Sequence, residues 1–186
     1  MMEHKILMAG FGGQGIMAMG QLVTYAGMVE GKQVSWMPSY GPEMRGGSAN
    51  CSVIVSDRPV GSPTVNMFNI GVFMNQVAFD KFIENAEKDA HIFVNSSLIE
   101  SKVDRDDVHV YYIPVNEIAQ EKIGNARTAN MVMLGSILEA VDIVDRNTVM
   151  DVFTKVFGEK RAKLKPINDQ AMQAGADAIN EQKTPA

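Results

Sequence analysis

The chain has 186 residues, of which 46% are hydrophobic, 21% charged and 7% aromatic, and its formal net charge is −5. At this length folding buries roughly 70% of the unfolded chain's surface, so a core forms without metal or disulfide support. The single cysteine, Cys51, excludes a disulfide within one chain, a structural zinc site and a four-thiolate iron–sulfur cluster. The mild acidic excess provides no electrostatic attraction for nucleic acid or for an anionic membrane.

Residues 6–29 carry no charged side chain, which by hydropathy alone resembles a membrane span. Six glycines and the polar Gln14, Gln21 and Thr24 interrupt this stretch, so it predicts a buried strand, a tight loop and a buried helix instead. The N-terminus lacks the basic start of a signal peptide. We therefore expect a cytoplasmic protein that binds neither membranes nor nucleic acid.

The first half of the chain predicts strands around one helix. Residues 6–9 form an apolar run that ends at glycine, which is typical of a strand buried on both faces, and residues 14–30 follow with a helical pattern. Further strands are expected over 33–37, ending at Pro38, and over 50–55. The segment between these two strands has no helical period, so they are either antiparallel or separated by a long functional loop.

The second half continues the alternation and ends in helices. A strand over 69–74 leads into a helix whose apolar positions are three and four residues apart: Phe79, Phe82, Ile83 and Ala86. Strands follow over 91–95 and 108–115. After Gly124 the pattern is helical, with one stripe made by Met131, Leu134, Leu138 and Val141. Thr148 and Asp151 have the spacing of a capping box, and the last helix is expected to begin after Pro166 and to fray after Asn180.

Strands that alternate with helices predict a three-layer, Rossmann-like α/β sandwich. We expect a mostly parallel sheet that admits an antiparallel strand, followed by a helical C-terminal third. Residues 1–186 are expected to form a single domain, because neither an internal repeat nor a boundary divides them.

A glycine-rich loop follows the first predicted strand and opens the first helix. Its residues fit the G-x-G-x-x-G spacing: Gly10, Phe11, Gly12, Gly13, Gln14 and Gly15. Glycines let the backbone approach an anion, and a helix N-terminus presents N–H groups and a partial positive charge. Ile16 and Met17 stand where a Walker loop requires Lys and Ser or Thr, and residues 33–39 offer no acid for a ribose, which disfavours a dinucleotide site. The alternative is that the glycines only make a tight turn under a closely packed helix.

A second unusual loop follows the second predicted strand. It combines glycines and a proline with one acid, one base and a tyrosine: Ser39, Tyr40, Gly41, Pro42, Glu43, Met44, Arg45, Gly46 and Gly47. Because ligands of open α/β sheets collect at the carboxyl ends of strands, we expect this loop, the glycine loop and Asn75 to converge at one edge. Arg45 could hold a phosphate or carboxylate through two hydrogen bonds. An internal Glu43–Arg45 pair that stabilises the loop is the alternative.

No catalytic constellation or metal-ligand spacing is visible elsewhere. The three histidines begin predicted strands, opposite the expected ligand edge, and are predicted to be surface or strand-end residues: His4, His91 and His109. Cys51 lies within a strand and is predicted to be a small core residue. For the basic cluster before Pro166, a solvated linker is favoured over a phosphate site: Lys160, Arg161, Lys163 and Lys165.

At its two loops the chain resembles the gamma subunit of the 2-oxoacid:ferredoxin oxidoreductases. The matching segments are residues 10–16, residues 39–47 running into 49–56, Asn75 and Gln76 followed by 79–82, and residues 130–135. The resemblance covers nearly the whole chain. It implies a multi-subunit enzyme that oxidatively decarboxylates a 2-oxoacid with coenzyme A and thiamine diphosphate, giving acyl-CoA, carbon dioxide and reduced ferredoxin.

The residues present limit the part that this chain plays in such an enzyme. One cysteine cannot hold the clusters, and no Gly-Asp-Gly segment followed by Asn, the usual diphosphate–magnesium signature, occurs. We therefore expect thiamine diphosphate, Mg²⁺ and the iron–sulfur clusters on partner subunits: alpha, beta and a ferredoxin-like delta. Alone, this chain is expected to be inactive and to contribute neither a catalytic residue nor a metal ligand. Its two loops are expected to shape the active-site mouth and to contact coenzyme A or the 2-oxoacid.

Two other interpretations stay open. One is an independent nucleotide- or NAD(P)-binding oxidoreductase, and the other is a purely structural subunit of the same complex. Among the substrates of the family, the look of the loops favours 2-oxoglutarate, then branched-chain 2-oxoacids such as 2-ketoisovalerate, with pyruvate as a further member.

Overall fold

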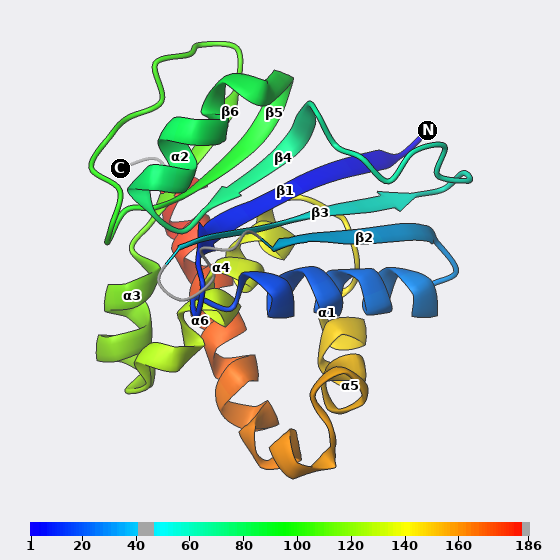
Figure 1. Ribbon diagram of the computed structural model, residues 1–186. Coiled ribbons are helices and arrows are strands. Elements are labelled where there is room, and N and C mark those ends of the chain that lie inside the picture. The colour runs from blue at the N-terminus through cyan, green and yellow to red at the C-terminus, as the bar shows by residue number, and fades with distance from the viewer. Residues whose placement is uncertain (41–46, 184–186) are drawn as a thin grey trace.

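The computed structural model describes residues 1–40 and 47–183, and for Tyr40 it describes the backbone alone (Figure 1). Six strands of this part of the chain form one sheet in the order β2-β3-β1-β4-β5-β6. Their bounds are β1 Glu3–Phe11, β2 Gln33–Tyr40, β3 Ser48–Ser56, β4 Phe68–Phe73, β5 Ala86–Asn95 and β6 His109–Ile113. Strand β3 is antiparallel to both of its neighbours, and the remaining pairs are parallel. The predicted mixed sheet is thus confirmed.

Helices cover the two faces of the sheet unequally (Figure 1). One face packs against four long helices: α1 (Ile16–Val29), α4 (Ala129–Ala140), α5 (Arg146–Phe157) and α6 (Lys165–Lys183). The other face packs against α2 (Gln76–Phe82), whose Ala78 and Phe79 bury against β4 and β5. The three-layer arrangement and the helical C-terminal third are therefore confirmed.

The core follows from the alternation of side chains along the strands. On β3, Cys51, Val53 and Val55 point to the face that α1 covers, and each has no exposed surface. Helices α4 and α6 approach so closely at Gly135 and Gly175 that a Cβ on either glycine would overlap the backbone of the other helix. This close contact fixes the C-terminal helix against the rest of the molecule.

The prediction that the second strand ends at Pro38 is wrong. Strand β2 continues to Tyr40, and Pro38 pairs with Cys51 of β3. Proline cannot donate a hydrogen bond to a ladder, but β2 is an edge strand with a partner on one side only. Its missing N–H therefore costs little at this position.

Three helix boundaries also differ from the predictions. Ala86 begins β5, because the helix ends at Phe82 and a 3-10 turn over Ile83–Asn85 follows. Val141 lies beyond the end of α4. Helix α5 is capped by Asp145, whose side chain accepts a hydrogen bond from the N–H of Asn147, so Thr148 and Asp151 do not form a capping box.

The elements after β6 also differ from the predicted ones. A short helix α3 (Val115–Glu117) and a π-helix over Ile118–Ile123 follow β6, so the strand predicted to reach Val115 ends earlier, at Ile113. Three residues of the basic cluster predicted as a solvated linker, Lys160, Arg161 and Lys163, lie in a 3-10 helix over Glu159–Leu164, and Lys165 begins α6. Helix α6 begins at Lys165 and extends to Lys183, beyond the predicted fraying point. In the described residues, no helix is sufficiently long and apolar to cross a membrane.

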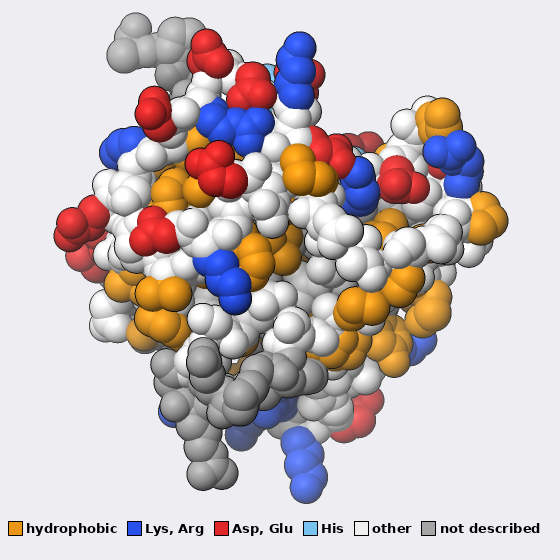
Figure 2. All heavy atoms as spheres, turned by 45° about the horizontal axis from the view of Figure 1, so that its top comes forward, with side chains coloured by type: hydrophobic (Ala, Val, Ile, Leu, Met, Phe, Trp, Pro, Cys, Tyr) orange, Lys and Arg blue, Asp and Glu red, His pale blue; other side chains and the backbone are white. Residues whose placement is uncertain are grey.

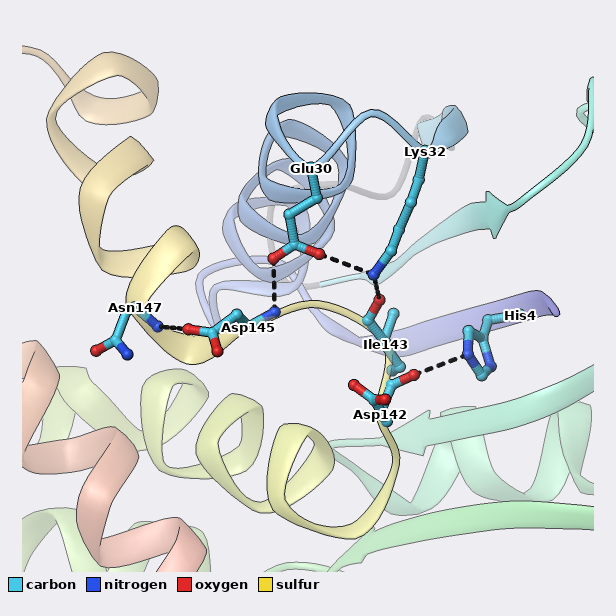
Figure 3. Close-up of polar contacts among 7 residues, drawn as sticks. All are labelled: His4, Glu30, Lys32, Asp142, Ile143, Asp145 and Asn147. Atoms are coloured by element: carbon cyan, nitrogen blue, oxygen red, sulfur yellow. Dashed lines mark hydrogen bonds and ion pairs between the residues drawn. The ribbon is translucent and has the colours of Figure 1, made fainter.

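A polar network joins α1 to the start of α5 at the amino edge of the sheet (Figure 3). The carboxylate of Glu30 accepts hydrogen bonds from Lys32 Nζ at 2.7 Å and from the Asp145 N–H at 2.7 Å. Lys32 also donates to the carbonyl of Ile143 at 2.6 Å. Burial raises the pKa of Glu30, but these hydrogen bonds and one with Thr148 outweigh it, so the pKa of Glu30 is lowered overall.

Candidate functional site

Two connections diverge at the carboxyl edge of the sheet, between β1 and β4. These strands are parallel neighbours, but the chain after β1 enters α1 on one face, whereas the chain after β4 enters α2 on the other. Such a divergence leaves a crevice beyond the strand ends, where open α/β sheets bind their ligands. The glycine loop and Asn75 border this point.

The glycine loop needs its glycines for two separate reasons. Gly13 and Gly15 have φ angles of 91° and 76°, a region that other residues rarely adopt. At Gly10 a Cβ would lie 2.5 Å from the side-chain oxygen of Gln14 and 2.9 Å from Met74 Cβ. The tight turn and the close packing that the alternative interpretation requires are therefore both present. Neither feature contradicts the binding of a ligand by this loop.

Gln14 connects the two strands that border the crevice. Its Oε1 accepts a hydrogen bond from the N–H of Phe11 at 2.6 Å, and its Nε2 donates to the carbonyl of Met74 at 3.1 Å. Gln14 thus closes the glycine loop and joins it to the end of β4. This gives Gln14 a structural role at the position where the sequence predicted a binding residue.

The second loop meets the first through the backbone. The N–H of Gly12 donates to the carbonyl of Gly47 at 3.1 Å, and Phe11 lies opposite Ser48 in the β1–β3 ladder. Because β2 runs parallel to β1, Ser39 and Tyr40 at its end reach the same edge. Five predicted site residues of this loop lie outside the described residues: Gly41, Pro42, Glu43, Arg45 and Gly46.

Asn75 stands at the start of α2. Its Oδ1 accepts a hydrogen bond from the N–H of Ala78 at 2.8 Å, so Asn75 caps the helix. The side chain is buried, with 3% of its surface exposed, and its Nδ2 has no hydrogen-bond partner among the described residues. A buried donor without a partner is costly, which makes this amide a candidate contact for a ligand or a partner chain.

Sequence reasoning missed two further asparagines near this edge. Asn130, at the start of α4, places its Nδ2 at 3.4 Å from the carbonyl of Gly15. Asn95, at the end of β5, donates to the Met74 carbonyl and to the side chain of Asn116. The signal for Asn130 was its segment, residues 130–135, which carried part of the family resemblance. Asn95 gave no such signal beyond following a strand.

The prediction that the three histidines stand at strand beginnings is confirmed for His4 and His109 but is wrong for His91, because β5 begins at Ala86. His91 and His109 stack with ring centroids 4.9 Å apart, and His91 Nδ1 is 3.1 Å from the hydroxyl of Tyr111. Burial lowers the pKa of His91, and His109 lowers it further. Cys51 is fully buried, and burial raises the pKa of its thiol to about 12, so it is the inert core residue that was predicted.

The arrangement is suited to binding rather than to proton transfer. Helix α1 has Gly15 as its N-cap, with no side-chain cap and no acidic residue in its first turn, which leaves an electropositive helix end at the crevice. No charged side chain lies in residues 6–29, which include the whole glycine loop. Within residues 1–40 and 47–183, no group of three or more His, Cys, Asp or Glu residues could hold a metal ion.

A family model described as "Pyruvate ferredoxin/flavodoxin oxidoreductase" matches residues 5–178. The chain therefore belongs to this family, which confirms the resemblance seen in the sequence and the expectation that the chain is of an oxidoreductase family. The match covers both loops. The particular members that it resembles are subunits of 2-oxoacid oxidoreductases.

Two named relatives show this similarity. The ketoisovalerate oxidoreductase subunit VorA of Methanothermobacter thermautotrophicus is 35% identical over 181 residues, which are 96% of this chain and 37% of that protein. The 2-oxoglutarate synthase subunit KorC of Methanocaldococcus jannaschii is 35% identical over 150 residues, which are 80% of each chain. This chain thus spans little more than a third of the length of the VorA subunits.

Solved structures share the fold. The gamma subunit of the keto/oxoacid ferredoxin oxidoreductase of Geobacter sulfurreducens superposes with a TM-score of 0.80 at 24% identity, over 96% of this chain and 99% of that one. The 2-oxoglutarate:ferredoxin oxidoreductase of Magnetococcus marinus, solved with 2-oxoglutarate, coenzyme A and succinyl-CoA bound, gives a TM-score of 0.86 at 24% identity. It covers 99% of this chain and 32% of that one.

Proposed function

We propose that this chain is the gamma subunit of a 2-oxoacid:ferredoxin oxidoreductase, which converts a 2-oxoacid and coenzyme A to acyl-CoA, carbon dioxide and reduced ferredoxin. The observation that carries the proposal is the meeting of two glycine-containing loops at the carboxyl end of β1, through the Gly12–Gly47 hydrogen bond, in a chain of this family. In this proposal the two loops shape the active-site mouth and contact coenzyme A.

The favoured substrate is 2-oxoglutarate. The names of the relatives divide between ketoisovalerate and 2-oxoglutarate. The four KorC subunits are matched over 69% to 98% of their length, whereas the two VorA subunits are matched over 36% and 37%. The pyruvate/ketoisovalerate common subunit gamma of Pyrococcus abyssi is also matched over 91% of its length, but at 25% identity, against 28% to 35% for the KorC subunits. The combination of matched length and higher identity supports 2-oxoglutarate over a branched-chain 2-oxoacid or pyruvate.

The redox and decarboxylation chemistry belongs to partner subunits in this proposal. The chain has one cysteine, which is buried, and its described residues offer no cluster of metal ligands, so they do not fit an iron–sulfur cluster or a diphosphate-bound Mg²⁺. Alpha and beta subunits and a ferredoxin-like delta subunit supply thiamine diphosphate, Mg²⁺ and the clusters. Ferredoxin takes up the electrons from the assembled complex in the cytoplasm.

Replacing Arg45 by Ala in the assembled complex tests the role of the second loop. We expect the KM for coenzyme A to rise roughly 10-fold, because a charge-assisted pair of hydrogen bonds contributes about 1.5–3 kcal/mol. The matched control is Arg58→Ala, since Arg58 lies in the turn after β3, at the amino edge, and 58% of its side chain is exposed. Unchanged turnover and unchanged affinities for coenzyme A and 2-oxoacid in R45A would remove the proposed role.

The two alternatives give different results in related measurements. A purely structural subunit would show loop variants that impair assembly and leave ligand affinities unchanged. An independent dinucleotide-binding oxidoreductase would show stoichiometric NAD binding by the isolated chain. Purification of the tagged chain from its native cell, followed by mass spectrometry, should recover cysteine-rich and thiamine-binding partners under the proposal.

A further inference from the structure

Two histidines lie side by side at the start of the β5–β6 ladder. His91 of β5 and His109 of β6 are register partners in this parallel pair, and His109 is the first residue of its strand. Partners in a ladder project to the same face of the sheet, and the two imidazole rings stack with centroids 4.9 Å apart and planes inclined by 25°. The fold therefore brings together two imidazoles that are 18 residues apart in the sequence (109 minus 91).

Tyr111 fixes the ring of His91. The Nδ1 atom of His91 lies 3.1 Å from the Tyr111 hydroxyl, and the two rings are nearly parallel, with an interplanar angle of 8°. Within residues 1–40 and 47–183 this is the one hydrogen bond of the His91 side chain, so its Nε2 is uncommitted. Histidines that ligate metals use one ring nitrogen for the metal and donate the N–H of the other to an oxygen atom. When Nδ1 of His91 donates to Tyr111, Nε2 carries the lone pair that a metal requires.

The ring of His109 can adjust its position. His109 is exposed, and in the described part of the chain its side chain forms no hydrogen bond and is held only by the stack on His91. Metal–nitrogen bonds of roughly 2.0–2.1 Å place two ligating nitrogens about 3 Å apart. Rings whose centroids are 4.9 Å apart reach this spacing when His109 turns about its side-chain torsions.

The charge state of His91 suits a metal ligand. Burial lowers the pKa of His91, and the neighbouring His109 and His4 lower it further, so the ring is neutral at pH 7. Lys183, at the end of α6, acts in the same direction. A cavity of about 330 Å³ opens beside His91, and it is also lined by Asp89, which forms no ion pair within the described residues. This carboxylate is opposite in charge to Lys183, and the cavity gives water access to the His91 ring.

Two imidazoles select the kind of ion. Imidazole nitrogens bind Cu²⁺, Ni²⁺ and Zn²⁺, whereas Mg²⁺ and Ca²⁺ prefer oxygen ligands. Because residues 1–40 and 47–183 contain no group of three or more His, Cys, Asp or Glu residues that could hold an ion, water completes the coordination of an ion bound by two histidines. The thiol of Cys51 does not compete for the ion, since it has no exposed surface and burial raises its pKa to about 12.

We propose that His91 and His109 form a binding site for one divalent transition-metal ion, held by a ring nitrogen of each histidine. A bound ion joins the edge strand β6 to its neighbour β5. The site lies at the start of β6, whereas the glycine loop follows the end of β1. It therefore does not rest on the function proposed above, and the two proposals can fail independently.

Isothermal titration of the purified full chain with NiCl₂ tests the site, after removal of any affinity tag and dialysis against a chelator. We expect one saturable site per chain and at least a roughly 10-fold loss of affinity in His91→Gln and in His109→Gln, because each variant replaces chelation by two linked ligands with binding by one. The matched control is His4→Gln, which removes the remaining histidine of the chain and should bind Ni²⁺ as the wild type does. Affinity should rise from Co²⁺ to Ni²⁺ to Cu²⁺, and MgCl₂ should give no binding.

Thermal unfolding provides a second measurement and checks that each variant is folded. Because only the folded chain holds the two rings together, Ni²⁺ should raise the unfolding midpoint of the wild type in a concentration-dependent manner. His109→Gln should abolish this rise, and since His109 is exposed, the substitution leaves the core intact.

Absence of saturable Ni²⁺ binding to the wild-type chain would overturn the proposal. So would equal affinities of the wild type and His109→Gln, since the ion would then bind elsewhere. A loss of affinity in His4→Gln as large as that in His91→Gln would also overturn it, because the site would then include a ligand from β1.

Discussion

The amino and carboxyl edges of the sheet differ in how completely their polar groups are paired. At the amino edge, Glu30 accepts two hydrogen bonds, Lys32 donates two, and the His4 ring lies 3.1 Å from the carbonyl of Asp142 (Figure 3). At the carboxyl edge, the N-cap of α1 is Gly15, which offers no side-chain cap, and Asn75 Nδ2 is buried without a partner among the described residues.

This difference indicates that the amino edge stabilises the fold, whereas the carboxyl edge is suited to binding. Polar groups at the amino edge are used to join α1 to the connection between α4 and α5, which holds the helical layer in place. Unpaired donors at the carboxyl edge raise the free energy of the isolated chain, and a ligand or partner chain that accepts hydrogen bonds would lower it. The edge at which the loops were predicted to converge is therefore the edge that has unpaired hydrogen-bond donors.

The charged surface is also uneven. Figure 2 shows acidic and basic side chains gathered over α2 and the neighbouring strands, whereas the exposed half of the sheet around β2 and β3 shows mainly uncharged atoms. Side chains of β2 and β3 on this side include Ser35, Met37, Asn50 and Ser52, and 39% of the surface of Met37 is exposed.

The largest expected effect comes from adding a methyl group to a glycine at each edge. Gly15 and Gly31 have φ angles of 76° and 78°, but a Cβ at Gly15 would overlap the side chain of Asn130, whereas Gly31 has nothing within 4 Å. A left-handed alanine costs about 1–2 kcal/mol at either site, and overpacking adds roughly 1–3 kcal/mol at Gly15. Urea unfolding of Gly15→Ala and Gly31→Ala should show this excess, and equal losses would contradict it.

A smaller effect is expected from Glu30→Gln at the amino edge. The amide keeps the shape of the side chain but weakens its hydrogen bonds to Lys32 and Asp145, so we expect a loss of roughly 1–2 kcal/mol in the free energy of unfolding. Glu139→Gln is the control, because Glu139 is exposed on α4. The measurement is chemical denaturation, and indistinguishable midpoints for the two variants would refute the role given to this network.

Two substitutions of Asn75 distinguish its role as a helix cap from a role as a ligand contact. Asn75→Ala removes the cap of α2 and should cost about 1 kcal/mol. Asn75→Ser keeps an acceptor for the N–H of Ala78 and removes the unpaired Nδ2, so its stability should stay within about 0.5 kcal/mol of wild type. Thermal unfolding compares them. If Asn75→Ser retains stability but weakens coenzyme A binding in the assembled complex, the amide is a contact; if it changes neither, the residue is a cap only.

The smallest effect is the pH dependence of stability. Burial lowers the pKa of His4 and of His91 below the ordinary value of 6.5, so the unfolded chain binds more protons than the folded chain once the pH falls below that value. Stability should therefore be complete above pH 6.5 and decline as the pH falls toward the folded pKa values. Thermal unfolding between pH 7.5 and 5 measures the decline, and H4Q/H91Q should flatten it. A wild-type curve as flat as that of the variant would disprove the effect.

The lowered pKa of Glu30 adds a second window at lower pH. Its stabilising contribution is present above the ordinary value of 4.5 and is lost as the pH falls through the folded pKa. The two windows distinguish the groups, since Glu30→Gln should alter the acid limb below pH 4.5 and leave the histidine limb unchanged.

Local patterns were sufficient for most of the elements. The apolar run before Gly10, the glycine loop and the uncharged helix after it were predicted in the right order, because each rests on residues close together in sequence. The predicted boundaries of elements were wrong where contacts with residues distant in the sequence determine them. Strand β2 passes through Pro38 because it lies at the edge of the sheet. Helix α5 is capped by Asp145 rather than by Thr148, and the N–H of Asp145 is held by Glu30, which follows the distant helix α1.

The sequence by itself determined the class of fold, the loop that opens α1, the inability of one cysteine to hold a redox centre, and the family. The first three follow from periodicity, glycine spacing and composition, which are local properties, and the family follows from the resemblance of the loop segments. Only the tertiary structure decided that β3 lies between β1 and β2, that Asn75 caps a helix with one donor left unpaired, and that His91 and His109 stack on neighbouring strands. Each of these depends on contacts between residues far apart in the chain, which no local pattern records.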